Sequence, residues 1–232
     1  MCFSASASFT AGAFLVPIGL YCVYAASTLK RYHYFMFALI PFFFGLQQII
    51  EGVVWLSLNS GDTKTLESFS VAFVFFSHFF WPFWIPLSAY FVAKKYKCPR
   101  AWTKLIFCII GIVVGLVGFV SFLHQGYHIQ TKMCAHSLDY SVNSVWNSLV
   151  GTSAPKYVYI AIIILPLWIS RDWAIKVFGG LILISVIITF LFYSYAFNSV
   201  WCFFSAVLSM YIVYLIRRKR ENSYNYKIKM GT

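Results

Sequence analysis

A single acidic residue lies inside a long apolar stretch of the sequence, in the segment GLQQIIEGVVW. A helix through this segment would place Gln47 and Gln48 one turn before Glu51 and Trp55 one turn after it, so two amides, a carboxyl group and an indole share one face. Carboxyl groups in apolar spans are costly unless they are paired, protonated or hydrated, and they usually mark functional sites. We therefore expect Glu51 to act as a catalytic base or a ligand. The structural alternative is a protonated acid that only bonds a neighbouring helix.

A histidine lies in a second apolar segment, FSHFFWPFWIP. Trp81 falls one turn after His78 on the same helix face, and Pro82 and Pro86 should kink the helix and free backbone carbonyl groups. Kinks of this kind open cavities beside a helix. A lone buried histidine is as often a satisfied hydrogen-bond donor as a functional group, so a catalytic or ligating role for His78 depends on what lies next to it.

A polar stripe runs along the last apolar segment, NSVWCFFSAVLS, where Asn198, Cys202, Ser205 and Ser209 recur at helical spacing. Serine in membrane helices commonly bonds backbone carbonyl groups, so the stripe alone is a weak signal. With Trp201 the segment supplies a thiol, hydroxyls and an indole. We expect the substrate to contact residues from all three segments: Gln47, Gln48, Trp55, Trp81, Trp201 and Ser205.

Composition and hydropathy place these segments in a membrane. The chain of 232 residues is 61% hydrophobic and only 10% charged, and apolar runs near the roughly 20 residues that cross a bilayer recur along it. Runs of this length indicate helices, which satisfy the backbone in lipid. In the fourth run, Gly111, Gly115 and Gly118 predict close helix packing. The sequence thus predicts an all-α bundle of seven transmembrane helices, the fifth being the shortest: Phe9–Ser27, Tyr34–Leu58, Ser68–Ala93, Lys104–Leu123, Tyr157–Ser170, Ala174–Phe197 and Asn198–Ile216.

Basic residues gather on one side of the predicted bundle. Of the 18 Lys and Arg residues, all but three fall on that side, the exceptions being Lys64, Lys132 and Lys156. By the positive-inside rule the N-terminus faces out and the C-terminus lies in the cytoplasm. We read residues 1–216 as one membrane domain with a long outer loop at 124–156, followed by a basic cytoplasmic tail at 217–232. The net charge of +12 follows this topology, so we expect the lipid bilayer, and no nucleic acid, as partner.

The topology brings several reactive side chains to the outer half of the bundle. At about 1.5 Å per helical residue, Glu51, His78 and Cys202 lie within the outer parts of their spans, and Cys2 lies at the mouth of the first span. Thiolate, imidazole and carboxylate are the usual zinc ligands, and the outer loop adds one thiol and one imidazole. One interpretation is therefore a zinc site built from some of these residues: Cys2, Glu51, His78, Cys134, His136 and Cys202.

Two further interpretations use the same residues without a metal. In an oxidising exterior, Cys134 pairs with Cys202 or Cys2 in a disulfide that pins the outer loop. Alternatively, Cys2 is a nucleophile activated by His78 or Glu51. The spacing matches no C-x-x-C or H-E-x-x-H motif, so all three interpretations stay open.

Four short stretches, MCFSASASF, QQIIEGVVW, WPFWIP and VWC, together resemble an uncharacterised family of bacterial multi-pass membrane proteins that begin with Met-Cys-Phe-Ser-Ala. The likeness spans the whole chain. It implies membrane topology and a site, and the bacterial inner membrane as location, but it names no activity and no substrate.

These patterns predict a metal- or thiol-dependent membrane enzyme that acts on a lipid-like substrate, with Glu51 as general base or ligand and His78 and Cys202 as ligands. Zinc is the expected cofactor, and a lipid-like or small-molecule ligand is the expected partner. One alternative is a transporter or proton-coupled carrier in which Glu51 titrates. Another is a receptor or scaffold without chemistry. A carrier needs polar residues through to the cytoplasmic side, where the spans look aromatic and apolar.

Overall fold

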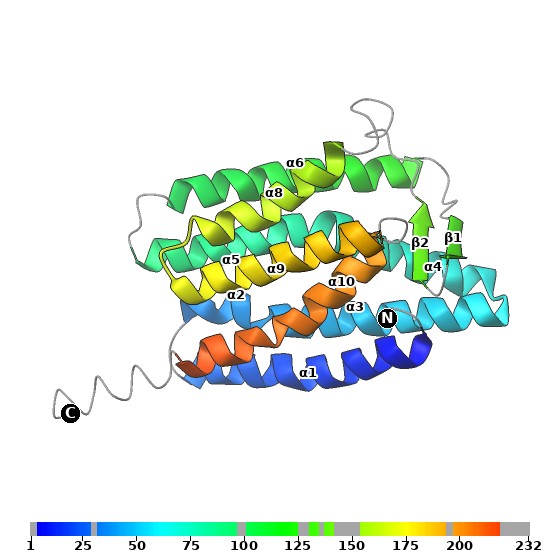
Figure 1. Ribbon diagram of the computed structural model, residues 1–232, viewed down its shortest axis with the longest axis horizontal. Coiled ribbons are helices and arrows are strands. Elements are labelled where there is room, and N and C mark those ends of the chain that lie inside the picture. The colour runs from blue at the N-terminus through cyan, green and yellow to red at the C-terminus, as the bar shows by residue number, and fades with distance from the viewer. Residues whose placement is uncertain are drawn as a thin grey trace.

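The computed structural model describes residues 4–28, 32–96, 101–124, 130–134, 137–141, 154–193 and 197–218. Within them the chain is helical apart from one hairpin of two short strands, β1 (Gln130–Cys134) and β2 (Ser137–Ser141). A 3-10 turn at Tyr32–Tyr34 precedes α2, and a π-helical segment at Phe75–Phe80 joins α4 to α5. The helices, labelled as in Figure 1, are α1 (Ala5–Thr28), α2 (Phe35–Ala38), α3 (Ile40–Ser60), α4 (Thr63–Val74), α5 (Trp81–Lys95), α6 (Ala101–His124), α8 (Ala154–Trp168), α9 (Trp173–Phe192) and α10 (Phe197–Ser209). After a turn at Met210 the last helix resumes and runs to Arg218.

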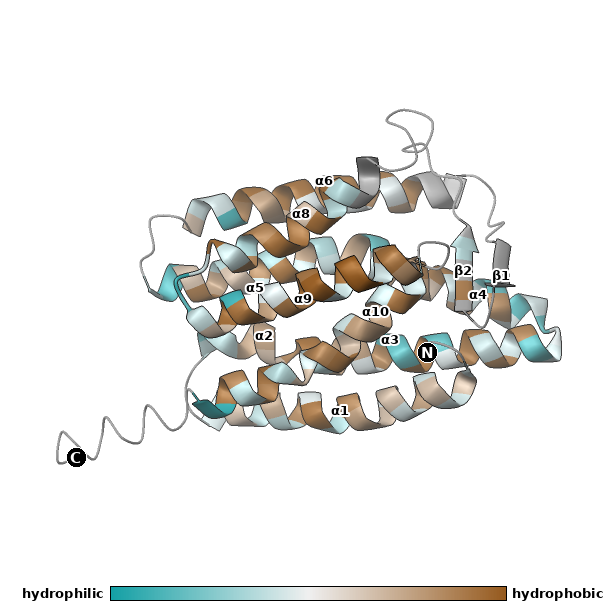
Figure 2. Cartoon of the chain, in the orientation of Figure 1, coloured by the Kyte–Doolittle hydropathy of each residue, from teal (hydrophilic) through white to brown (hydrophobic). Residues whose placement is uncertain are grey.

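The described helices form a polytopic membrane bundle. The apolar stretch at Tyr157–Trp168 is shorter than a full span, in keeping with the predicted fifth span. Figure 2 shows apolar residues along the helices and hydrophilic ones mostly near the two ends of the bundle. Among the described residues, six helical stretches are long and apolar enough to cross a bilayer: Ala5–Thr28, Tyr32–Ser60, Thr63–Lys95, Ala101–Val120, Trp173–Phe192 and Ser199–Arg218.

Two features differ from the sequence-based expectation. The sequence predicts a helix up to Phe197, but α9 ends at Phe192 because Tyr193 leaves helical geometry with φ −136°, and α10 begins at Phe197. The outer loop predicted at 124–156 contains the β1–β2 hairpin, in which Gln130 pairs with Ser141. Two such short strands gain stability from the elements they pack against, which a sequence pattern does not reveal.

α1 and α3 pack antiparallel and very close together through glycines (Figure 1). A Cβ atom on Gly19 would lie 2.4 Å from the backbone nitrogen of Phe42, and one on Gly45 would lie 2.8 Å from that of Val16. Side chains do not fit at these positions, so glycine lets the two backbones touch. This contact holds α3, the helix that carries Glu51, against α1 along its length.

α6 packs against α5 in the same way. Pro86 has no N–H that could bond the carbonyl group of Pro82, one turn earlier in α5. α6 approaches this carbonyl group so closely that a Cβ atom on Gly111 would lie 2.0 Å from the carbonyl oxygen. One turn further along α6, a Cβ atom on Gly115 would lie 3.0 Å from Cα of Phe79. Gly111 and Gly115 therefore serve the close helix packing that their spacing predicts.

The π-helical segment results from Pro82. The N–H of Trp81 donates to the carbonyl group of Phe76, five residues earlier, so the next bond of this pattern would run from Pro82 to Ser77. Proline has no N–H, and the hydroxyl group of Tyr159 on α8 donates to the Ser77 carbonyl instead, at 2.5 Å. The backbone irregularity caused by Pro82 is thus a π bulge whose freed carbonyl group ties this span to α8.

A tight turn connects α3 to α4 at the end of the bundle near the hairpin (Figure 1). α3 ends at Gly61, whose φ of 72° is the left-handed conformation that glycine favours. Asp62 then caps α4 by accepting the backbone N–H of Thr65. The Thr65 hydroxyl also donates to this carboxylate, and these bonds hold the pKa of Asp62 below its usual range.

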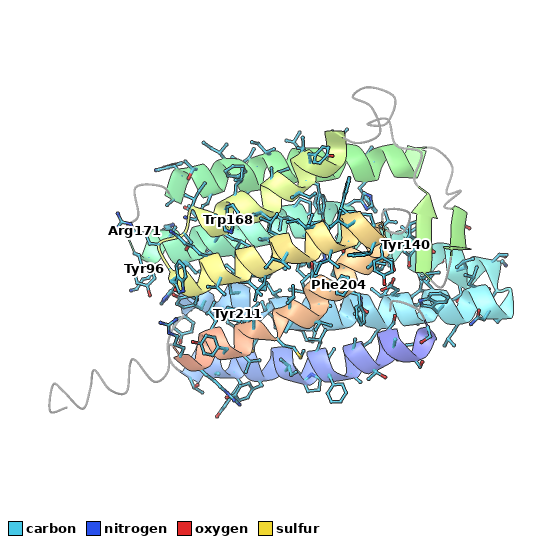
Figure 3. All side chains as sticks on the ribbon, in the orientation of Figure 1. Tyr96, Tyr140, Trp168, Arg171, Phe204 and Tyr211 are labelled. Atoms are coloured by element: carbon cyan, nitrogen blue, oxygen red, sulfur yellow. The ribbon has the colours of Figure 1, made fainter. Side chains whose placement is uncertain are left out.

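The opposite end of the bundle is fastened by an aspartate. Arg171 and Tyr96 lie there, far from Tyr140 on β2 (Figure 3). Asp172 caps the N-terminus of α9 and also accepts the hydroxyl group of buried Tyr34, at 2.5 Å. This bond joins the start of the second span to the turn between α8 and α9.

Replacing Gly111 by alanine should destabilise the protein, because the added methyl group meets the Pro82 backbone oxygen, which cannot move aside. We expect a loss of about 1–3 kcal/mol, the usual cost of overpacking, seen as a lower unfolding temperature of purified protein. Gly180→Ala is the matched control, because a Cβ atom on Gly180 meets nothing within 4 Å. Equal unfolding temperatures for the two variants would contradict close packing at Gly111.

Tyr159→Phe should also destabilise the protein, because it leaves the buried Ser77 carbonyl group without a donor. The expected loss is about 1–3 kcal/mol, the cost of one unsatisfied buried acceptor. Tyr157→Phe serves as the control, since the Tyr157 side chain is 57% exposed two residues earlier on the same helix. The two variants are compared by thermal unfolding in the same detergent, and an unchanged Tyr159→Phe would mean that the π bulge does not need this bond.

Candidate functional site

Glu51 lies fully buried where α3 meets α10. One carboxylate oxygen accepts the hydroxyl group of Ser199 on α10 at 2.5 Å, and the other accepts the side-chain amide of Gln48 at 3.1 Å. Protein groups thus solvate the carboxyl group in place of water, as an acid in an apolar interior requires. Because Ser199 comes from a span far along the chain, this arrangement exists only in the folded bundle.

Gln47 extends the site from α3 to α5. Its Oε1 accepts the indole N–H of Trp81 at 2.7 Å, and the Trp81 ring stacks on Phe44 with 3.8 Å between ring centroids. The Gln47 amide also lies beside the thiol group of Cys202 on α10. Three spans therefore meet at one polar cluster around Glu51.

Several buried polar atoms in this cluster have no hydrogen-bond partner among the described residues. Three are donors, namely Nε2 of Gln47 and the indole nitrogens of Trp55 and Trp201, and one is an acceptor, Oε1 of Gln48. Each atom of this kind costs about 1–3 kcal/mol if it is left unbonded. Buried polar groups in native proteins are nearly always bonded, so these atoms indicate a place for water or for a polar ligand.

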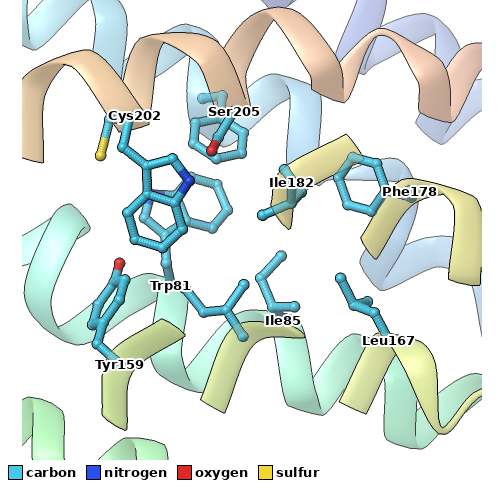
Figure 4. A pocket seen from close by; sticks show the side chains of 11 residues that line it. Trp81, Ile85, Tyr159, Leu167, Phe178, Ile182, Cys202 and Ser205 are labelled. Carbon is cyan, nitrogen blue, oxygen red and sulfur yellow. The ribbon is translucent and has the colours of Figure 1, made fainter. Parts of the chain in front are cut away.

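A small cavity lies beside the cluster (Figure 4). It measures about 20 Å³, room for a water molecule or a small chemical group. Cys202 and the hydroxyl group of Tyr159 lie toward one end, and Leu167 and Phe178 lie at the other. Its wall is mostly aromatic and aliphatic: Phe44, Trp81, Ile85, Tyr159, Ile163, Leu167, Phe178, Ile182, Trp201, Cys202 and Ser205.

The structure brings the predicted substrate-contacting residues into one region. Trp81, Trp201 and Ser205 line the cavity, together with the predicted ligand Cys202. Gln47 is bonded to the cavity wall through Trp81. Gln48 and Trp55 lie within one helical turn of Glu51, which is itself next to the cavity wall rather than part of it.

The β1–β2 hairpin covers this region at one end of the bundle. Leu138 and Tyr140 are buried and pack in one apolar cluster with Trp55 and Cys202. The Tyr140 ring also stacks on Phe73 of α4, with 4.4 Å between ring centroids. The hairpin therefore closes this end of the bundle over the candidate site.

His78 has a hydrogen-bond partner in its own helix. Its Nδ1 is bonded to the hydroxyl group of Ser77 at 2.8 Å, and no hydrogen bond among the described residues joins it to Glu51. The prediction that His78 shares a face with Trp81 assumes α-helical spacing, whereas His78 lies inside the wider π turn. Trp81 bonds Gln47, and the His78 ring bonds Ser77. A catalytic or ligating role for His78 stays a prediction.

No three His, Cys, Asp or Glu side chains lie close enough to hold a metal ion in the part of the chain that the structure describes. Cys2 and His136 lie outside the described residues, and only the backbone of Cys134 is described, in β1. Cys202 is a buried free thiol, so it does not pair with Cys134, whereas a disulfide between Cys134 and Cys2 stays a prediction. The zinc site stays a prediction, since half of its candidate ligands lie outside the described side chains.

Sequence reasoning missed Ser199, the residue that bonds Glu51 across the helix interface. Ser199 lies three residues before Cys202 in NSVWC, so the helical spacing that selects Cys202 fits it as well. The same spacing fits Asn198, and no one-dimensional pattern distinguishes the two. The helical spacing thus points to Ser199, but it points equally to Asn198.

Comparison with known proteins gives a family and no activity. The model of a family of unknown function, DUF6629, matches residues 1–227. No curated protein and no solved structure matches the chain. The matched range covers nearly all of the 232 residues, in line with the resemblance seen in the sequence. The chain therefore belongs to the DUF6629 family, whose function is unknown.

Proposed function

We propose that the protein is a membrane-embedded enzyme in which Glu51 acts as a general base on a lipid-like substrate. The observation that carries this proposal is the Glu51 carboxyl group, buried in the bundle and bonded across two helices by Ser199 and Gln48. An acid that served only to join helices would not need the unpartnered amide and indole groups around it.

The geometry at Glu51 suits proton transfer. A general base must lie within hydrogen-bond reach of the proton that it removes. The Ser199 hydroxyl proton meets this condition, with 2.5 Å between the two oxygens. Burial strengthens electrostatic interactions at such a site, because little water is present to screen them. The unpartnered donors Gln47 and Trp201 are the groups available to stabilise negative charge on a bound substrate.

The surroundings favour a lipid-like substrate over a water-soluble one. The cluster lies within membrane-spanning helices and is covered on its outer side by Leu138 and Tyr140. The adjoining cavity is lined by aromatic and aliphatic side chains. Substrates that already reside in the bilayer match both features.

A carrier that uses Glu51 to move protons has less support. The cavity wall is apolar at the end formed by Leu167 and Phe178. Protons and polar solutes cross membranes along chains of polar or ionisable groups. A thiol-dependent reaction at Cys202 has less support as well, because thiols buried in apolar surroundings are usually inert.

Replacing Glu51 by glutamine tests the enzyme proposal. Glutamine keeps the shape and can still bond Ser199 and Gln48, but it cannot take up a proton. Purified protein is incubated with total polar lipids, and the products are followed by mass spectrometry. We expect a lipid product whose rate of formation falls by about 10²–10⁴-fold in Glu51→Gln, the usual contribution of a general base.

The matched control is Glu67→Gln, which changes an exposed glutamate on α4 in the same way and should form product at the wild-type rate. Unfolding temperatures of both variants show whether a loss of product reflects loss of the fold. If no lipid product depends on Glu51, the acid is a structural group and the enzyme proposal is wrong.

We also propose that the end of the bundle carrying the hairpin faces outward, with the N-terminus outside and the C-terminus in the cytoplasm. Lys94 and Lys95 at the end of α5, Arg171 and the terminal Arg217 and Arg218 all lie at the opposite end, as the positive-inside rule requires. A fluorescent protein fused after Thr232 should fluoresce, since it folds in the cytoplasm. An alkaline phosphatase fused at the same position should be inactive, and the reverse result would invert the orientation.

A further inference from the structure

We infer that Ser199 is the nucleophile of this site and that the substrate is an ester of a membrane lipid, cleaved by acyl transfer to Ser199. The inference rests on the proposed role of Glu51 as general base. It adds Ser199 as a second catalytic residue and identifies an ester as the bond that is cleaved.

The hydrogen bonds around Glu51 have the order expected of an activated nucleophile. Such a site places a hydroxyl group within reach of a base, and a third group orients the base. Here the Ser199 hydroxyl donates to one oxygen of Glu51 at 2.5 Å, and the Gln48 amide donates to the other at 3.1 Å. All three side chains are fully buried, so the arrangement is not screened by solvent.

Acyl transfer also needs donors for the negative charge that develops on the carbonyl oxygen. One unpartnered buried donor, Nε2 of Gln47, lies one turn before Glu51 on the same face of α3. The carbonyl oxygen of an ester can accept a hydrogen bond from this amide, whereas an amine or other cation would leave the amide unsatisfied. The unpartnered donor at Gln47 therefore favours an ester over a cationic ligand.

The reaction balances without any group beyond the substrate and water. Ser199 Oγ bonds to the ester carbonyl carbon while its proton passes to Glu51 and the carbonyl π electrons move onto the oxygen. The bond from that carbon to the alcohol oxygen then breaks, and the alcohol leaves with the proton held by Glu51. Water attacks the acyl group on Ser199, giving a proton to Glu51. The carboxylic acid departs as that proton returns to Ser199 Oγ.

A fluorophosphonate probe, which forms a covalent bond with activated serine hydroxyl groups, tests the inference on the full-length protein in detergent. We expect peptide mass spectrometry of the wild-type protein to locate the adduct on Ser199. Glu51→Gln should slow labelling by about 100-fold or more, as loss of a general base does. Ser209→Ala is the matched control, since Ser209 is a buried serine on the same helix that bonds only the backbone of Ala206. It should be labelled like the wild type.

Limited access must not be mistaken for lack of reactivity. The same labelling is therefore run on Tyr140→Ala, which removes a ring from the apolar cluster that contains Trp55 and Cys202. We expect faster labelling of Ser199 in this variant. An absence of adduct on Ser199 in both proteins would overturn the inference.

The lipid-product measurement separates this inference from the proposed function. If Ser199→Ala and Glu51→Gln both abolish the product, both statements hold. If Glu51→Gln abolishes the product but Ser199→Ala does not, Glu51 is the base of a reaction with another nucleophile and the inference is overturned. If neither variant changes the product, the proposed function fails together with the inference.

Discussion

The burial of one carboxyl group constrains much of this bundle. Moving a carboxylate out of water costs several kcal/mol unless protein donors replace the lost hydrogen bonds. Ser199 and Gln48 supply these bonds to Glu51, which requires α10 to lie against α3 in one register. Glycines let the backbones of α3 and α1 touch, and this contact positions α3 so that it can meet α10 in that register. A shift of α3 along its neighbours would leave the acid without a partner.

The backbone irregularity at the prolines contributes to the same site. Pro82 removes a donor and the chain responds with a π turn, so the helix face after the turn is rotated relative to regular α geometry. Trp81 lies where the turn ends, and its indole reaches Gln47. Tyr159 bonds the freed Ser77 carbonyl and also lines the cavity, so one residue both stabilises the bulge and shapes the space beside Glu51. Stability and site geometry are therefore coupled at this point.

The region around Glu51 combines a hydrogen-bonded acid, unpartnered donors and a small cavity, and the β1–β2 hairpin covers it. Each feature alone has a structural explanation: acids join helices, cavities occur by chance, and hairpins close bundles. Their coincidence is better explained by a ligand site, because the unpartnered donors raise the energy of the empty state and a bound acceptor would lower it. Membership in a family of unknown function leaves the choice of reaction to this local chemistry.

The sequence by itself determined the membrane class, the approximate spans and the polar residues that carry the site, because hydropathy and helical spacing are local properties. It also pointed to Glu51, since an acid in an apolar run is conspicuous. Only the tertiary structure decided which residues meet. It brings Ser199 to Glu51 and places Trp81 and Trp201 in the wall of the cavity. His78 is bonded to Ser77. The hairpin cover was likewise decided by packing. The physical reason is that contacts between side chains of different helices depend on the register and rotation of those helices. Glycine contacts and a π turn set both, and the spacing of residues along the sequence contains neither.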